Sequence, residues 1–190
     1  MKKLIPVIAL LIGAYGAFGQ GVVSFRNGPA DLPSPPDRLV RMPDMVTPVI
    51  GTTFAVQLLY GADSASLTPH PTLAYFRASL SPGTWSGANR TLNNVALPAT
   101  PQPGTVSLGP LIWLQVNVWD SGAGRTVPFS QATVFGSTLF QYQQRLSDPP
   151  DTADAAMRNF QSFSLVPEPS VIGLGLIGIG ALFMLRRRKA

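Results

Sequence analysis

The residues best suited to bind a ligand lie in one alternating stretch, from Leu111 to Asp120. In a β-strand, successive side chains point to opposite faces, and here one face is wholly apolar: Ile112, Leu114, Val116 and Val118. The opposite face carries Trp113, Gln115, Asn117 and Trp119. Indole rings stack on the apolar faces of sugars, and amide groups hydrogen-bond sugar hydroxyls. These four residues are therefore candidate glycan contacts.

A second interpretation of the same face is packing. The two tryptophans would be roughly 20 Å apart along a strand. Because tryptophan is highly buried on average, both indoles can equally lie under covering segments, and this interpretation is favoured. Trp85, in the Gly/Ser-rich loop from Ser81 to Gly87, is a further candidate for an exposed aromatic side chain.

The residues of common catalytic and metal sites are scarce. The chain has no Cys and one His, which excludes a thiol nucleophile and a thiolate metal site and argues against a histidine-based one. His70 stands between two prolines, where a loop is expected. Asp148, Asp151 and Asp154 are three residues apart, a spacing that favours helix capping over a calcium loop. The sequence therefore predicts no catalytic residues, no metal site and no cofactor.

The first nineteen residues are typical of a secretory signal peptide. Lys2 and Lys3 precede the apolar run from Leu4 to Ala14, which is too short to span a bilayer comfortably. The small residues around Gly19 predict cleavage between Gly19 and Gln20, with a second choice after Gly16. An uncleaved membrane anchor is the alternative.

An apolar segment near the C-terminus predicts a second membrane element. Residues 171–185 are uncharged, and a basic cluster follows at once: Arg186, Arg187, Arg188 and Lys189. A helix of this length spans roughly 22 Å, less than the ~30 Å hydrocarbon core, so the arginines must snorkel to the interface. The basic cluster favours the cytoplasmic side for that end, which puts the rest of the chain outside.

Three residues before this segment complete a recognisable tail. Pro167, Glu168 and Pro169, the apolar helix and the basic terminus together resemble the PEP-CTERM sorting signal of Gram-negative bacteria. The resemblance implies an exosortase-type membrane protease as a partner, a transient stay in the inner membrane, and delivery to the cell surface or extracellular matrix. It also implies association with extracellular polysaccharide or biofilm matrix. The alternative is a plain linker before a permanent anchor.

The charge pattern bears on the choice of partner. The net charge of +5 comes from the two ends, because residues 21–165 hold eight Arg against eight Asp, with no Lys and no Glu. A neutral central domain lacks the excess of positive charge that binding to phosphate backbones requires. The sequence therefore predicts no nucleic-acid partner.

The elements that must position these residues are mostly strands. Runs rich in β-branched and aromatic residues, separated by Pro/Gly turns, predict about seven: 22–25, 54–60, 72–80, 91–97, 105–108, 111–120 and 160–165. Gly109 and Pro110 predict a turn between the fifth and sixth strands. Short helical turns are expected at 130–135 and 151–160, and a long loop at 29–48. Phe54, Val56, Leu58 and Tyr60 should share one face.

These observations predict an all-β fold, a β-sandwich for which a jelly roll is one option, between a signal peptide and a C-terminal transmembrane helix. The domains are 1–19 (signal peptide), 20–165 (secreted β-sandwich) and 166–190 (sorting tail). The predicted function is a secreted or cell-surface structural or adhesive protein without enzymatic activity. The alternative is a carbohydrate-binding module that recognises a specific glycan.

Overall fold

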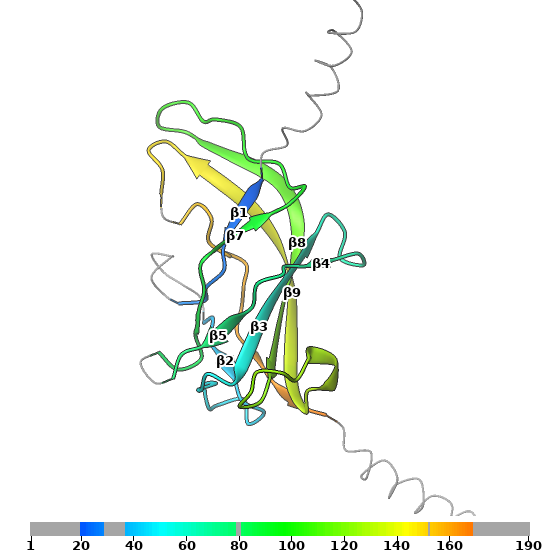
Figure 1. Cartoon of the computed structure of the whole chain (residues 1–190). Coiled ribbons are helices and arrows are strands. Elements are labelled where there is room, and N and C mark those ends of the chain that lie inside the picture. The colour runs from blue at the N-terminus through cyan, green and yellow to red at the C-terminus, as the bar shows by residue number, and fades with distance from the viewer. Residues whose placement is uncertain (1–19, 29–36, 79–80, 152, 169–190) are drawn as a thin grey trace, which may run out of the picture.

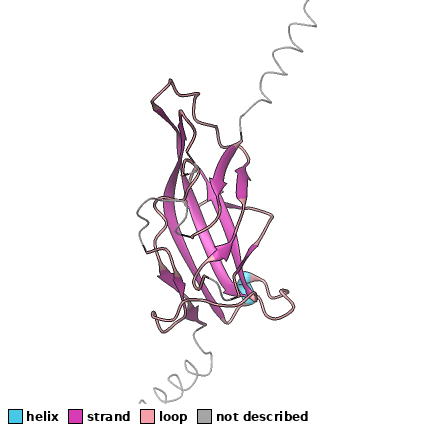
Figure 2. Ribbon diagram, turned by 90° about the vertical axis from the view of Figure 1, so that its left-hand side faces the viewer, coloured by secondary structure: helices cyan, strands magenta, loops and turns pink. Residues whose placement is uncertain are grey.

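The computed structural model describes residues 20–28, 37–78, 81–151 and 153–168, and these form an almost entirely β structure (Figure 2). The only helical element in these ranges is a three-residue 3-10 turn, Phe129–Gln131. The strands are β1 (Gly21–Ser24), β2 (Val40–Arg41), β3 (Phe54–Gly61), β4 (Thr68–Pro69), β5 (Ala74–Phe76), β6 (Trp85–Ser86), β7 (Asn89–Leu92), β8 (Val106–Asp120), β9 (Val134–Ser147), β10 (Phe163–Ser164) and β11 (Val166–Pro167). The prediction of an all-β fold is confirmed.

One seven-stranded sheet forms the main layer. Its strands lie in the order β11-β9-β8-β3-β5-β6, and β4 pairs with β3. The long antiparallel strands β8 and β9 run side by side through most of the length of the molecule (Figure 1). β3 pairs with β8 over all eight of its residues, from Phe54 opposite Asp120 to Gly61 opposite Trp113.

The register of this sheet places the predicted apolar faces together. Phe54, Val56, Leu58 and Tyr60 of β3 are buried, and so are Ile112, Leu114, Val116 and Val118 of β8. Because these strands are in register, the two sets form one continuous apolar surface on the same side of the sheet. The shared faces predicted for both strands are confirmed.

A second, smaller layer covers that surface. It consists of two two-stranded ribbons, β1 with β7 and β2 with β10, together with the turn segment 153–160. Buried residues from this layer that contribute to the core include Val23, Val40, Leu92, Met157 and Phe160. The described residues thus form one large sheet faced by two ribbons, rather than the two full sheets of a jelly roll.

Trp85 corrects one expectation. Its side chain is 1 % exposed, so the prediction of an exposed loop aromatic is wrong. The indole packs against Phe25, Phe76 and Phe160 at ring-centre distances of 5.5, 5.9 and 5.5 Å, and its Nε1 donates a 3.0 Å hydrogen bond to the carbonyl oxygen of Phe25. The Gly/Ser-rich context did not reveal these contacts, because the aromatic neighbours come from three separate segments and the acceptor from the residue just after β1.

Strand boundaries differ from the predictions around β8 and β9. The turn predicted at Gly109 and Pro110 is wrong, because β8 continues through both residues with a bulge between Leu108 and Leu111. Residues 134–147, for which no strand was expected, form β9. Its inward side chains Phe140, Tyr142 and Gln144 alternate with outward Gln141 and Gln143. Because Gln144 is polar at an inward position, the alternation of apolar and polar residues is too short to indicate a strand clearly.

The two predicted helices are not present as such. The 3-10 turn covers Phe129–Gln131 and strand β9 begins at Val134, so the helical turn expected at 130–135 is wrong. The described part of 151–160 consists of turns and a bridge without a helix. In place of a helix, this segment lies along the outer edge of β9, where Arg145 donates its backbone N–H to the carbonyl oxygen of Asp154 at 3.1 Å.

The structure does not describe the two segments that the sequence predicts to enter the membrane. The predicted signal peptide (1–19) and the predicted transmembrane helix (171–185) both lie outside the described residues. Within the ranges that the structure covers, no helix has the length and apolar character to cross a bilayer.

Candidate functional site

The folded domain extends into the predicted sorting motif. Leu165 is 1 % exposed and donates its N–H to the carbonyl oxygen of Arg41 at 2.8 Å. Val166 and Pro167 then form β11, which pairs antiparallel with Phe135 and Val134 at the start of β9. Glu168 donates its N–H to the carbonyl oxygen of Thr133 at 2.7 Å. Ordered structure therefore passes the predicted domain boundary at 165 and includes two of the three motif residues.

A proline can be part of this strand because β11 lies at the edge of the sheet. Proline has no N–H, so it fits an edge strand on which one side of the backbone needs no partner. The side chains of Val166, Pro167 and Glu168 are exposed. The motif thus lies on the surface while its backbone is tied to β9.

The two ends of the described chain lie at opposite ends of the domain. The chain enters at β1 at the top of Figure 1 and leaves beyond β11 at the bottom. Gln20, the predicted mature N-terminus, is exposed directly before β1, whereas Gly19 lies outside the described residues. Pro169 and the basic cluster Arg186, Arg187, Arg188 and Lys189 also lie outside them.

Trp119 belongs to a second, smaller apolar cluster on the outer face of the main sheet. Its side chain is 4 % exposed, and its Nε1 donates a 2.7 Å hydrogen bond to the carbonyl oxygen of Val127. Phe129 stacks edge-on against it at 5.7 Å, and Phe135 follows at 5.6 Å from Phe129. The segment after β8 covers this indole. Trp119 therefore packs inside the protein, as the favoured interpretation of the sequence predicted.

The other three candidate glycan contacts lie further along β8. Trp113 and Gln115 are half-buried, whereas Asn117 is 6 % exposed and its Oδ1 accepts a 2.8 Å hydrogen bond from Gln115 Nε2. The four predicted residues therefore do not form one open row. Trp113 and Gln115 retain an accessible part, while Asn117 and Trp119 are buried.

The cross-strand neighbours of Trp113 and Gln115 were missed from the sequence because β9 was not recognised. Gln141 is opposite Trp113, Leu139 is opposite Gln115, and Gln143 is opposite Leu111. Leu111 and Leu139 are 54 % and 46 % exposed. This sheet surface, defined by Leu111, Trp113, Gln115, Leu139, Gln141 and Gln143, combines apolar and amide groups. The alternation in residues 139–143 is the signal that could have located it.

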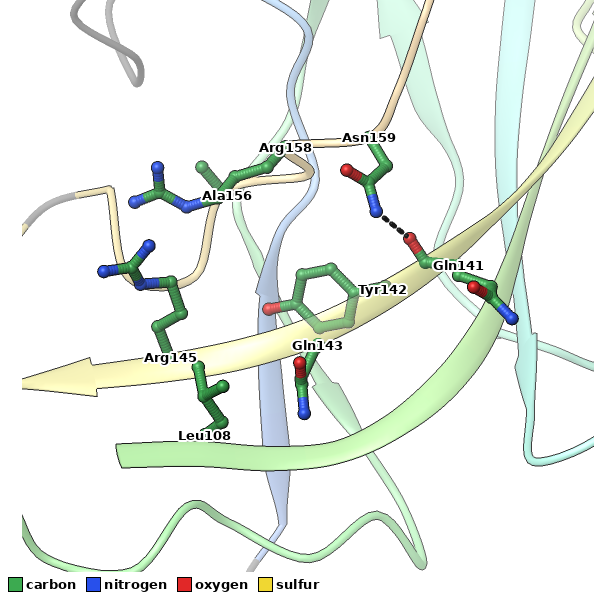
Figure 3. A pocket seen from close by; sticks show the side chains of 8 residues that line it. All are labelled: Leu108, Gln141, Tyr142, Gln143, Arg145, Ala156, Arg158 and Asn159. Atoms are coloured by element: carbon green, nitrogen blue, oxygen red, sulfur yellow. Dashed lines mark hydrogen bonds between the residues drawn. The ribbon is translucent and has the colours of Figure 1, made fainter. Parts of the chain in front are cut away.

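A cavity of about 260 Å³ opens beside this surface, between β9 and the segment 153–160 (Figure 3). Gln141 and Gln143 line it together with Arg145 and Arg158. Tyr142 forms one wall; its hydroxyl donates to the carbonyl oxygen of Val22 at 2.7 Å, and burial raises the pKa of that hydroxyl. Sequence reasoning did not single out either arginine, because the two are distant in the chain and belong to no local motif.

Two of the three spaced aspartates, Asp151 and Asp154, stabilise turns through their side chains. Asp154 accepts hydrogen bonds from the Ser147 backbone N–H at 2.8 Å and from the Ser147 hydroxyl at 2.7 Å. Burial acts to raise the pKa of Asp154, but these bonds and the Arg145 charge outweigh it and the pKa is lowered. Asp151 accepts a 3.0 Å bond from the Ala153 N–H, as a cap would, although no helix follows.

His70 lies in a short connection between β4 and β5. Its Nδ1 accepts a 3.1 Å hydrogen bond from the Thr72 N–H. Partial burial and the nearby Arg90 charge lower the pKa of His70, which favours the neutral ring.

Comparison with known families assigns the C-terminal region. Residues 165–189 match the PEP-CTERM protein-sorting motif. The chain therefore carries the signal of a protein that is exported, held briefly in the membrane, processed by an exosortase and directed toward the cell surface. No curated protein and no solved structure matched the chain.

Proposed function

We propose that this protein is a structural or adhesive component of the cell surface that associates with extracellular polysaccharide or biofilm matrix and has no enzymatic activity. The observation that carries the proposal is that the sorting motif follows a folded β domain without a spacer. One face of that domain carries exposed apolar and amide side chains next to Trp113. Apolar and amide groups together suit sugar rings and their hydroxyls.

The absence of enzymatic activity is part of this proposal. His70 accepts a backbone hydrogen bond in a loop, and Asp154 is engaged by Ser147. Among the described residues, neither group is hydrogen-bonded to a second titratable side chain, the pairing on which general acid–base catalysis is commonly built. A screen in which the purified protein hydrolyses any glycan would overturn this part of the proposal.

The sorting part is tested by the intact mass of the protein recovered from the native cell exterior. We expect a mass that begins at Gln20 and ends near Pro167 to Ser170, with or without an added group. A recovered protein that still contains residues 171–190 would make the tail a permanent anchor and would overturn exosortase processing.

The polysaccharide part is tested by co-sedimentation with the extracellular polysaccharide of the native cells. Trp113→Ala should reduce retention while it lowers the free energy of unfolding by about 1 kcal/mol or less. The matched control is Val46→Ala, which also removes an exposed apolar side chain, of 76 % exposure, from the loop that follows β2 in the second layer. Equal retention of both variants and the unsubstituted protein would contradict a role for the surface.

The second candidate function is a carbohydrate-binding module with a defined glycan ligand. The cavity beside the sheet surface favours it, because a general adhesive surface needs no enclosed site.

A further inference from the structure

The cavity between β9 and the segment 153–160 contains two positive charges. Arg145 and Arg158 both line it, the first from β9 and the second from the facing segment, as Figure 3 shows. No carboxylate is among the residues that line it. Two guanidinium groups on one cavity repel each other, and an anion placed between them would relieve this repulsion.

The hydrogen bonds of the two guanidinium groups are incomplete within the described residues. The Nε atoms of Arg145 and Arg158 are buried without an acceptor there. Arg158 Nη2 donates to the carbonyl oxygen of Ala153 at 3.1 Å, whereas the guanidinium of Arg145 bonds to no described residue. The adjacent acid, Asp154, directs its carboxylate to Ser147. The terminal amino groups of Arg145 and the Nη1 of Arg158 are therefore available to an external acceptor.

The side-chain amides of Gln143 and Asn159 have oxygen atoms that can still accept hydrogen bonds. Gln143 donates its Nε2 to the carbonyl oxygen of Gly109 at 2.9 Å, and Asn159 donates its Nδ2 to that of Gln141 at 3.0 Å. The side-chain oxygens of both residues then need hydrogen-bond donors. A ligand with hydroxyl groups supplies such donors, whereas a fully ionised inorganic anion does not.

The size and walls restrict the ligand further. About 260 Å³ is slightly below the roughly 300–1,000 Å³ of typical small-molecule sites, so the cavity suits one ring-sized unit. Leu108 and Tyr142 provide apolar contact area. Gln141 belongs both to the cavity and to the sheet surface, where it lies opposite Trp113, so a longer chain could continue from the cavity onto that surface.

We propose that this cavity binds the acidic sugar unit of an extracellular polysaccharide, with its carboxylate on Arg145 and Arg158 and its hydroxyl groups on the oxygens of Gln143 and Asn159. The proposal rests on the proposed association with polysaccharide and names its ligand class. Arginine presents a planar fork of donors that matches a carboxylate in two parallel hydrogen bonds.

The place of the cavity in the fold suits an external ligand. The sorting tail pairs with the beginning of β9 at Phe135, and the cavity lies near Gln143, roughly 27 Å further along the same strand. The cavity and the sorting motif therefore lie at opposite ends of β9, and a ligand in the cavity leaves the motif uncovered.

The test is calorimetric titration of the full chain, purified in a nonionic detergent, with D-galacturonate. D-galactose, which has the same ring without the carboxylate, and inorganic phosphate are titrated in parallel. We expect binding of galacturonate, no detectable binding of galactose, and no displacement of galacturonate by equimolar phosphate. Binding should weaken as the salt concentration rises, because two partly exposed charges hold the ligand.

Three variants connect the binding to the cavity. Arg145→Gln and Arg158→Gln should each weaken galacturonate binding roughly tenfold or more, because each loses a charge-assisted hydrogen bond. The matched control is Arg77→Gln, an exposed arginine next to β5, and it should bind like the unsubstituted chain. If Arg158→Gln fails to fold because its bond to Ala153 is lost, Arg145→Gln still decides the result.

Each other outcome overturns the proposal. If phosphate binds as tightly as galacturonate, the cavity is a general anion site and the sugar assignment falls. If galactose binds equally well, the arginines do not select the ligand. If none of the three binds, the cavity assignment falls, while the intact-mass measurement above still decides independently whether the tail is processed.

Discussion

Glu168 donates its backbone N–H to the carbonyl oxygen of Thr133 across 2.7 Å, and this bond joins the sorting motif to the edge of the main sheet. The residues just before it, Val166 and Pro167, pair with the same strand. A protease generally needs its substrate backbone extended and free to pair with the enzyme. The edge pairing keeps the motif extended and occupies one side of its backbone, so β11 must leave β9 before another protein can bind that side.

This pairing predicts protection of one amide proton. In the folded protein we expect the N–H of Glu168 to exchange with solvent at least roughly tenfold more slowly than that of Ala123, an exposed turn residue. Amide hydrogen exchange followed by NMR measures both protons in one experiment. Equal exchange rates would mean that β11 is not held to β9 in solution.

The two tryptophans of β8 predict losses of stability that differ in size. Trp119→Ala should lower the free energy of unfolding by about 3–5 kcal/mol, because it empties a buried, hydrogen-bonded site. Trp113→Ala should cost about 1 kcal/mol or less, because its side chain is only half-buried. Urea unfolding followed by circular dichroism compares them, and similar losses for the two variants would contradict the structure.

Asn27, just after β1, connects two distant segments: the one before β2 and the one that leads into β6 of the main sheet. Its side chain is 1 % exposed, donates to the carbonyl oxygens of Arg38 and Gly83 at 2.8 Å each, and accepts from the Trp85 N–H at 3.0 Å. Asn27→Ala should cost about 2–3 kcal/mol, because it leaves buried backbone groups without partners. The control Asn89→Ala, at an exposed position of β7, should change the unfolding midpoint little. A thermal scan that shows the same shift for both would refute this role.

Asp154 predicts a loss of stability in acid. Its pKa is lower in the folded protein than the ordinary 3.8, so it stabilises the fold above that value, and this contribution is lost as the pH falls through the folded pKa. Asp154→Asn should therefore lose stability at pH 7 and show a shallower decline below pH ~4.

The comparison for this pH dependence is Asp63→Asn, which changes an exposed aspartate in the loop after β3. Urea midpoints measured between pH 2 and pH 7 give the two curves. If Asp154→Asn follows the unsubstituted protein through the acid range, the bonds from Ser147 do not lower this pKa as described.

Local patterns predicted much of the main sheet correctly. The alternation in 54–60 and 112–118 gave the right inward faces, because a strand with one buried face shows a period of two in its sequence. The same reasoning failed for β9, where the alternation of Phe140 to Gln143 is short, because Leu139 is exposed before it and the polar Gln144 is buried after it. It also failed at Gly109 and Pro110, which read as a turn but form part of a bulge that pairing on β9 holds in place.

The all-β class, the inward faces of β3 and β8 and the sorting motif in residues 165–189 could be predicted from the sequence. Each of these features depends on a pattern of residues that are close together in the chain. Tertiary structure alone decided that Trp85 and Trp119 are buried, that Glu168 is tied to Thr133, and that Arg145 and Arg158 share a cavity. The physical reason is distance along the chain. Burial and charge pairing depend on which remote segments meet, and a linear pattern reports only near neighbours.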